Sequence, residues 1–150
     1  MSSEIMSASD RLDIIDVINR LFIATDSRDW ETVKQCFTDP VTIDMSSVGA
    51  GAAREMKPAE IAGMWETGLS RLKGIHHQAG NYVVTMEGNG ATVFCYGIAL
   101  HYLPNPSGRN TRTFVGSYDF QLSRDRGPWE ISKMRFNLKW LDGNPDLESS

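Results

Sequence analysis

Three histidines are the residues of this chain best suited to proton transfer at neutral pH. Histidine has an unperturbed pKa of about 6.5, so it can accept a proton without strong tuning by its surroundings. His76 and His77 are neighbours in a segment that predicts a strand, so their side chains should face opposite sides of a sheet. His101 lies near the end of a later predicted strand, where it could reach the mouth of a pocket or lie on the surface as an ordinary strand-end residue. A catalytic histidine also needs a partner that holds its ring, and an aspartate is a common one.

Metal, nucleophilic and phosphate-binding chemistry each lack the residues that they need. The chain has no HExxH motif, and neither Cys36 nor Cys95 lies at ligand spacing from a histidine, so a zinc site is not expected. Ser117 lacks the GxSxG context of a nucleophilic serine. The glycine-rich segment 49–53 has no surrounding βαβ pattern and no GKS or GKT ending, so it is not a phosphate loop. We therefore expect a site that works without a metal or a cofactor.

The composition is that of a globular chain without concentrated charge. Its 150 residues are 41% hydrophobic and 23% charged, which fits a single domain over residues 1–150. The net charge is −4 and the arginines are scattered, which argues against a nucleic-acid partner. The first ten residues lack the pattern of a signal peptide, and the longest apolar stretch, Ala91 to Leu100, is about half the length of a membrane span. Because two cysteines make no disulfide framework, we expect a cytoplasmic protein without a membrane partner.

Three amphipathic helices are predicted in the first half of the chain, where apolar residues recur at steps of three and four. Residues suited to helix N-caps, or a proline, precede each apolar stripe. Breakers follow the second and third stripes. The predicted helices run from Asp10 to Thr25, from Asp29 to Asp39-Pro40, and from Pro58 to Gly74.

Strands dominate the second half, which predicts an α+β fold with helices on one face of an antiparallel sheet. Gly88-Asn89-Gly90 and the segment from Arg124 to Pro128 predict turns, and the segment from Ser46 to Arg54 predicts a mobile loop. The last ten residues are expected to fray. The predicted strands are Val41–Met45, Ile75–Glu87, Ala91–Tyr102, Thr111–Ser123 and Trp129–Trp140.

The predicted strand from Ala91 to Tyr102 has two unequal faces. Because successive side chains alternate, its odd positions form one face and its even positions the other. The odd positions are small, which leaves room for a pocket or else lets a helix pack directly on the strand without one. The even positions are bulky, so that face needs a cover such as a second subunit. The odd residues are Ala91, Val93, Cys95, Gly97, Ala99 and His101, and the even residues are Thr92, Phe94, Tyr96, Ile98, Leu100 and Tyr102.

Several segments follow one another in the order and at the spacing of a known family. They are Thr25–Glu31, Val41–Asp44, Met56–Met64, His77–Asn81, the turn Gly127-Pro128-Trp129-Glu130 and the ending Lys139-Trp140. Together they resemble scytalone dehydratase and its SnoaL-like relatives in the nuclear transport factor 2-like (NTF2-like) superfamily, over about 130 residues. The resemblance implies an NTF2-like cone, in which a curved antiparallel sheet with three helices packed on its concave face encloses an apolar pocket.

An Asp–His pair is the catalytic feature that the resemblance implies. Asp26 falls where the family has a buried aspartate, and His77 falls where it has the catalytic histidine. The same two positions match the pair that lindane dehydrochlorinase, another relative, uses for its elimination. Contact is feasible because Asp26 ends a predicted helix and His77 begins the strand that this helix would cover. The alternative is that Asp26 is a helix-terminal cap and His77 an ordinary core side chain.

The rest of the family's pocket is changed in this chain. The dehydratase's second histidine aligns with Gly97, and its two pocket tyrosines align with Thr25 and Met45. A serine and an asparagine of the next strand align with Gly116 and Tyr118. Scytalone-type dehydration therefore lacks the groups that polarise its substrate and hold its water. The Tyr118 hydroxyl could replace the amide as a donor to a substrate oxygen, or the ring could serve packing alone.

We expect a cofactor-free lyase or isomerase in which His77, oriented by Asp26, removes a proton from a carbon next to an activating group. The substrate would be a small, apolar, cyclic molecule, and Tyr118 would stabilise charge that develops on its oxygen. The alternative is a protein with the same cone that binds a small ligand or has a structural role without chemistry. In both cases we expect a homodimer or homotrimer, because the even row of the strand is too apolar to leave in water. The row consists of Phe94, Tyr96, Ile98, Leu100 and Tyr102.

Overall fold

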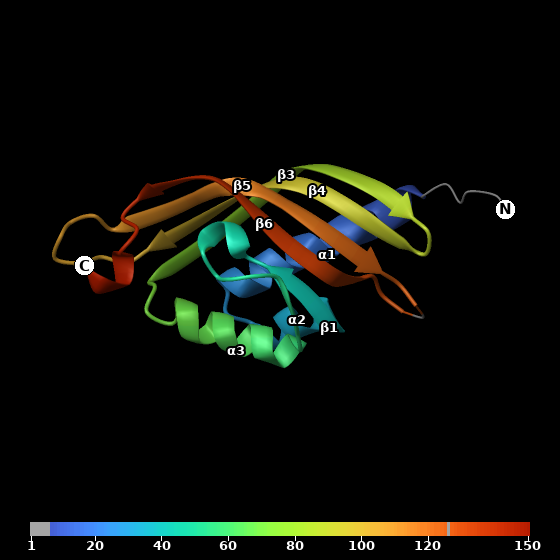
Figure 1. Ribbon diagram of the computed structural model, residues 1–150, viewed down its shortest axis with the longest axis horizontal. Coiled ribbons are helices and arrows are strands. Elements are labelled where there is room, and N and C mark those ends of the chain that lie inside the picture. The colour runs from blue at the N-terminus through green and yellow to red at the C-terminus, as the bar shows by residue number, and fades with distance from the viewer. Residues whose placement is uncertain (1–6, 126) are drawn as a thin grey trace.

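Residues 7–125 and 127–150, which the computed structural model describes, form a curved six-stranded sheet with three α-helices on its concave face (Figure 1). This arrangement confirms the predicted α+β fold. The helices are α1 (Ala8–Asp26), α2 (Trp30–Gln35) and α3 (Pro58–Leu69), with short 3₁₀ helices η1 (Ser46–Val48) and η2 (Leu147–Ser149). The strands are β1 (Phe37–Asp44), β2 (Arg54–Met56), β3 (Gly74–Glu87), β4 (Gly90–Tyr102), β5 (Thr111–Ser123) and β6 (Glu130–Gly143).

The sheet has the strand order β2-β1-β6-β5-β4-β3. Strands β3 to β6 form the predicted antiparallel meander, while β1 lies parallel to β6 and antiparallel to β2. The register shifts between Gly80 and Val83 in β3 and between Val115 and Gly116 in β5. Because bulges of this kind bend a strand, they curve the sheet around the space beneath its concave face.

Helix α1 lies along the sheet (Figure 1). Its apolar face packs toward β3, and Ile14 and Ile18 are fully buried there. Ser7 caps the helix, since its hydroxyl accepts a hydrogen bond from the backbone N–H of Asp10 at 3.0 Å. The buried face fixes the direction of the helix and so brings its last residue, Asp26, next to β3.

The second helix is shorter than predicted, because pairing with β6 starts directly after it. Helix α2 ends at Gln35, and Phe37 is already the first residue of β1, paired in register with Ile131. Pro40 therefore lies inside a strand and does not end a helix. The register shifts between Phe37 and Thr42, so Pro40, which has no N–H to donate, lies where the ladder is interrupted.

Arg28 accounts for the early end of the third helix. Its guanidinium donates hydrogen bonds to the carbonyl oxygens of Leu69 at 2.9 Å and Leu72 at 2.7 Å, which satisfies backbone groups that a helix end leaves free. Gly74 therefore begins β3 instead of closing the helix. The loop predicted to reach Arg54 also stops early, since Arg54 begins the edge strand β2. The predicted turn from Arg124 to Pro128 includes residue 126, which is outside the described residues.

The last ten residues are ordered against the molecule, contrary to the predicted fraying. Strand β6 continues to Gly143, and the η2 segment follows. Asn144 is buried and Leu147 is fully buried. The Arg109 guanidinium donates to the Gly143 carbonyl at 2.9 Å, and the Asn144 amide donates to the Arg109 carbonyl at 3.1 Å. These contacts bring Glu148 to the end of the sheet where β4 and β5 meet.

The two faces of β4 differ as the sequence predicts. Its odd side chains lie on the concave side, where Val93 and Cys95 are fully buried in the core with the α1 residues. Its even side chains lie on the outer face, and the five bulky ones are each 36–47% exposed. None of the helices in the described residues has the length and apolar character needed to cross a lipid bilayer.

Candidate active site

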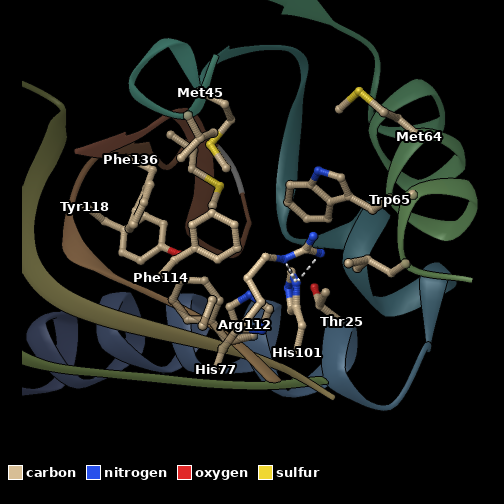
Figure 2. Close-up of a pocket in the computed structure, with 16 residues that line it drawn as sticks. Thr25, Met45, Met64, Trp65, His77, His101, Arg112, Phe114, Tyr118 and Phe136 are labelled. Atoms are coloured by element: carbon tan, nitrogen blue, oxygen red, sulfur yellow. Dashed lines mark hydrogen bonds between the residues drawn. The ribbon is translucent and has the colours of Figure 1, made fainter. Parts of the chain in front are cut away.

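A cavity of about 330 Å³ lies between the concave face of the sheet and helix α3. Figure 2 shows Met64 and Trp65 of α3 across the cavity from Tyr118 and Phe136 of the sheet. This volume is at the lower end of the range for small-molecule pockets. The polar members of the wall are Thr25, His77, His101, Arg112 and Tyr118, and the others are Phe22, Met45, Val48, Met64, Trp65, Gly68, Leu69, Ala99, Phe114, Met134 and Phe136.

The predicted contact between Asp26 and His77 is confirmed. Asp26 Oδ1 lies 2.6 Å from His77 Nδ1, and Asp26 Oδ2 accepts the His77 backbone N–H at 2.8 Å. Both side chains are largely buried, with 19% of Asp26 and 14% of His77 exposed. The Phe22 ring stacks on the imidazole with 5.2 Å between ring centroids. The carboxylate and the aromatic ring together fix the imidazole plane.

This geometry leaves one nitrogen of His77 for chemistry. An ionised carboxylate is only an acceptor, so the nitrogen that faces it, Nδ1, carries the hydrogen. Nε2 is then the unprotonated nitrogen, and His77 lines the cavity. Such a ring can take a proton from a bound molecule, and the carboxylate stabilises the imidazolium that forms.

Two of the four residues predicted for the pocket wall lie in it. Thr25 and Met45 line the cavity. The Thr25 hydroxyl donates to the Leu21 carbonyl at 2.8 Å, so it is engaged with its own helix. Met45 adds apolar surface beside η1.

The prediction that Gly97 and Gly116 line the pocket is wrong, because aromatic rings cover both. A Cβ at Gly97 would lie 2.1 Å from the Tyr118 ring, and a Cβ at Gly116 would lie 2.7 Å from the Phe136 ring. The register explains both contacts. Gly97 pairs with Gly116 and Cys95 with Tyr118, so the tyrosine leans diagonally onto the glycine of the neighbouring strand. The room left by the small face of β4 is thus partly filled by aromatic rings.

Tyr118 forms part of the cavity wall, as the sequence suggested. Its ring packs against Phe22, Phe120 and Phe136 at centroid distances of 4.9–5.5 Å. Burial raises the pKa of its phenol above the ordinary value, with smaller contributions from Cys95 and Asp26. The hydroxyl therefore keeps its proton, and it has no hydrogen-bond partner among the described side chains. It can donate to an oxygen placed in the cavity.

His101 is a second histidine in the wall. The sequence left open whether it lies at the pocket or on the surface. It is buried, lines the cavity and contacts the Phe114 ring. The Arg112 guanidinium donates to its Nδ1, with Nη2 at 2.9 Å and Nε at 3.3 Å (Figure 2). Arg112 Nη2 also lies 2.7 Å from Glu148 Oε1. Burial, then the charge of Arg112 and then His77 lower the pKa of His101 to about 4, against a smaller opposing effect of Asp26.

Sequence reasoning did not identify Arg112 or Glu148. A charged residue at a strand end is usually solvated, and Glu148 belongs to the segment expected to fray. The sequence did hold a signal for His101 itself. It shares the odd face of β4 with Ala99, which also lines the cavity, so its side chain could be expected to face the same way.

The remaining candidates for chemistry lie apart from this cavity. His76 is exposed on the opposite face of β3, so the three histidines do not meet. No three His, Cys, Asp or Glu side chains in residues 7–125 and 127–150 are grouped as metal ligands would be. Cys36 and Cys95 are free and buried, and burial raises their pKa to about 11 and about 12. Thiols with such pKa values are poor nucleophiles at neutral pH.

Comparisons with known proteins agree with this architecture. Residues 6–135 match the family model described as a SnoaL-like domain. No curated protein matches the sequence.

Three solved structures illustrate what the chain is similar to. The Kfla4162 protein from Kribbella flavida has a TM-score of 0.89 at 24% identity, covering 95% of this chain and 98% of that one. A proposed aromatic ring hydroxylase from Novosphingobium aromaticivorans has a TM-score of 0.81 at 25% identity, covering 95% and 99%. A proposed scytalone dehydratase from the same organism has a TM-score of 0.78 at 12% identity, covering 91% and 88%. These likenesses confirm the NTF2-like cone.

Proposed function

This chain belongs to the SnoaL-like domain family of the NTF2-like superfamily, and we propose that residues 1–150 form one domain that acts as a cofactor-independent lyase or isomerase. His77 would remove a proton from a carbon next to an activating group of a small, apolar, cyclic substrate. One observation carries the proposal: Asp26 contacts His77 Nδ1 at 2.6 Å in the wall of a mostly apolar cavity. A base needs this combination of an oriented ring and a site with little water.

The role proposed for Asp26 follows from the two hydrogen bonds that its carboxylate accepts. It accepts two hydrogen bonds, one from the His77 ring and one from the His77 backbone, so it orients the residue at two points. In the neutral ring it places the hydrogen on Nδ1, which leaves Nε2 as the acceptor, and it balances the positive charge after proton transfer. We propose Asp26 as the residue that orients and stabilises His77, and His77 as the general base.

We propose that Tyr118 donates a hydrogen bond to the substrate oxygen on which charge develops. Its buried phenol stays protonated, and its hydroxyl lacks a partner among the described residues. Thr25 and Met45 would shape the wall without taking part in the reaction. The chemistry differs from that of scytalone dehydratase, because Gly97 takes the place of the dehydratase's second histidine.

Hydrogen exchange on a cyclic ketone tests this proposal without knowledge of the natural substrate. 2-Tetralone carries acidic protons next to its carbonyl, and their exchange for deuterium in D₂O is followed by NMR. We expect the wild-type protein to accelerate this exchange, and His77→Ala to lower the rate roughly 10³-fold, the typical contribution of a general base. The matched control is His76→Ala, which removes the exposed neighbouring ring and should keep the wild-type rate. No acceleration by the wild type, or an unchanged rate in His77→Ala, would rule the mechanism out.

A second candidate function is ligand binding or a structural role without chemistry. The observation that favours it is the character of the wall, since Thr25, Met45 and Gly97 occupy the positions of three polar groups of the dehydratase. The exchange experiment separates the two functions, because a binding protein would hold 2-tetralone and leave its exchange rate at the level of the buffer.

We also propose a homodimer or homotrimer that forms through the outer face of β4. The exposed apolar row there is Phe94, Tyr96, Ile98, Leu100 and Tyr102. A contiguous aromatic row suits the core of an interface. Phe94→Glu with Leu100→Glu should give smaller particles by sedimentation, whereas Leu12→Glu with Ile23→Glu, on the exposed side of α1, should not. A wild-type protein that is monomeric at tens of micromolar would contradict this.

The cytoplasm is the compartment that we propose for the protein. The two buried, unlinked cysteines support this, because oxidising compartments favour disulfides.

A further inference from the structure

His101 and His77 line the same cavity, yet the groups that hold their rings have opposite charge. Asp26 accepts a hydrogen bond from Nδ1 of His77, whereas Arg112 donates hydrogen bonds to Nδ1 of His101. A ring nitrogen that accepts from a guanidinium carries no hydrogen, so the hydrogen of a neutral His101 is on Nε2. That Nε2–H group has no acceptor among the described side chains, although the residue is buried in the cavity wall.

We propose that His101 is a further catalytic residue, a neutral donor that hydrogen-bonds through Nε2–H to a substrate oxygen, and that Arg112 is a positioning residue that fixes this tautomer. The inference deepens the proposed function and rests on it for the statement that the bound molecule reacts. It adds a residue that the family resemblance does not assign, since the dehydratase's second histidine aligns with Gly97 and not with His101.

Arg112 is too fully engaged to be the substrate's own partner. Its Nε and Nη2 donate to His101, its Nη1 donates to the Pro145 carbonyl at 3.3 Å, and its Nη2 pairs with Glu148. Glu148 also neutralises its charge. An anionic substrate therefore gains little from Arg112, and an uncharged acceptor oxygen that meets His101 fits the site better.

The protonation state of His101 suits a donor that keeps its proton. Burial and the charge of Arg112 lower its pKa to about 4, so the ring is neutral at physiological pH. A neutral imidazole is a weak acid, and it can hydrogen-bond to a developing oxyanion without transferring its proton.

These two rings together fit a substrate that carries a carbonyl oxygen next to an acidic C–H group. His77 Nε2 takes the proton from the carbon beside the carbonyl, and the electron pair of the broken C–H bond forms the C=C bond of an enolate. The carbonyl oxygen gains the negative charge and accepts hydrogen bonds from His101 Nε2–H and the Tyr118 hydroxyl. The proton on His77 then passes to another carbon of the enolate system, or to a hydroxyl on the carbon next to the new C=C bond. In the second case the C–O bond breaks, the enolate electrons re-form C=O and leave a C=C bond, and water departs, so neither outcome needs an oxidant or reductant.

Ligand affinity tests the oxygen contact with a matched pair of probes. 2-Tetralone and tetralin share a carbon skeleton and differ at the carbonyl, and NMR titration gives Kd for each. The affinity for 2-tetralone relative to tetralin should fall about fivefold to tenfold in His101→Phe, the value of one hydrogen bond. His101→Gln, which keeps an N–H donor, should stay within about twofold of the wild type, and so should His76→Ala. An unchanged ratio in His101→Phe, or no binding of either probe to the wild type, would overturn the inference.

Nitrogen NMR tests the positioning role without relying on a variant that must fold and bind. Long-range ¹H–¹⁵N spectra of the wild type at pH 7 should show His101 with a bare Nδ1 and a protonated Nε2. Arg112→Gln should lose that fixed tautomer. If Arg112 had only a structural role, the tautomer of His101 would stay the same in this variant. A wild-type His101 that is protonated on Nδ1 would overturn the inference.

The two proposals fail in different measurements. If ketone exchange is absent but the 2-tetralone ratio still depends on His101, the proposed function is wrong and the oxygen contact stands. If exchange depends on His77 but the affinity ratio of 2-tetralone to tetralin is the same in His101→Phe, His77 remains the proposed base and this inference is wrong.

Discussion

Two histidines line the cavity on the neighbouring strands β3 and β4, and they differ in the charge of the group at Nδ1. At the junction of α1 and β3, a carboxylate lies 2.6 Å from Nδ1 of His77. From β5, the Arg112 guanidinium lies 2.9 Å from Nδ1 of His101 on β4. Under the proposed mechanism, the same side chain acts as a proton acceptor at His77 and as a hydrogen-bond donor at His101.

This difference teaches that the neighbour of a histidine decides its role more than the residue type does. The contrast also depends on burial. His77 and His101 are both largely shielded from water, so water competes little with the hydrogen bond between each ring and its partner. Four variants separate what each partner contributes.

Asp26→Asn should have the largest effect, because it reverses the hydrogen bond at His77. An amide can donate to Nδ1, which would move the ring hydrogen to Nε2 and remove the base. We expect the exchange of 2-tetralone to slow about 10³-fold. Asp16→Asn on the exposed side of α1 is the matched control and should keep the wild-type rate. A rate for Asp26→Asn within twofold of the wild type would mean that the carboxylate does not set the tautomer.

The second largest effect should be a pH-dependent loss of stability caused by the lowered pKa of His101. Its pKa is about 4 in the folded protein and about 6.5 when unfolded, so between these values the unfolded state binds more protons. The stabilisation is therefore complete above pH 6.5 and is lost as the pH falls toward 4. Relative to His101→Gln, the wild type should lose up to about 3 kcal/mol of unfolding free energy across that window.

Chemical denaturation at a series of pH values measures this difference. The titratable and charged groups near His101 are Arg112, Glu148, His77 and Asp26, and all of them remain in the variant. His76→Gln serves as the control, since His76 is exposed. Parallel stability curves for the wild type and His101→Gln would show that His101 is not held neutral by its surroundings.

Gly97→Ala should displace the Tyr118 ring and leave His101 unchanged. A Cβ at this position would lie 2.1 Å from the Tyr118 ring, so the ring must move within a packed aromatic cluster. We expect a loss of stability of about 1–3 kcal/mol, as overpacked cores show. The His101 tautomer should stay unchanged by ¹⁵N NMR, and a stability equal to the wild type would contradict the close packing.

The parts of the site that could be predicted are those that local patterns encode. Apolar spacing located α1, and alternation located β3 and β4, which made a contact between Asp26 and His77 feasible. The pairing itself was implied by the family resemblance. The small odd positions of β4 correctly marked its concave face. One strand's pattern could not show that Tyr118 of the next strand fills the space at Gly97, because that depends on the diagonal register of β4 and β5.

The second histidine's surroundings depend on contacts between distant residues. Arg112 lies opposite His101 in the β4–β5 register, and Glu148 reaches it from the last residues of the chain. The polar edge strand β2 was missed for a related reason. Its pairing with β1 makes it a strand, and its own residue pattern does not indicate one. Sequence patterns describe how one element repeats, whereas these contacts arise where elements meet.

Glu148→Gln should have the smallest effect and tests the limit of the comparison. Glu148 pairs with Arg112 at 2.7 Å but does not contact His101, so the guanidinium should still donate to Nδ1 after the charge is removed. The ion pair is partly exposed, and we expect a cost of about 1 kcal/mol in unfolding free energy. The control is Glu66→Gln on the exposed side of α3, with no expected change. ¹⁵N NMR should show the wild-type tautomer of His101 in Glu148→Gln, in contrast to Arg112→Gln. Loss of that tautomer would mean that the acidic residue, and not the guanidinium alone, holds the ring, and the contrast between a carboxylate and a guanidinium as partners would no longer hold.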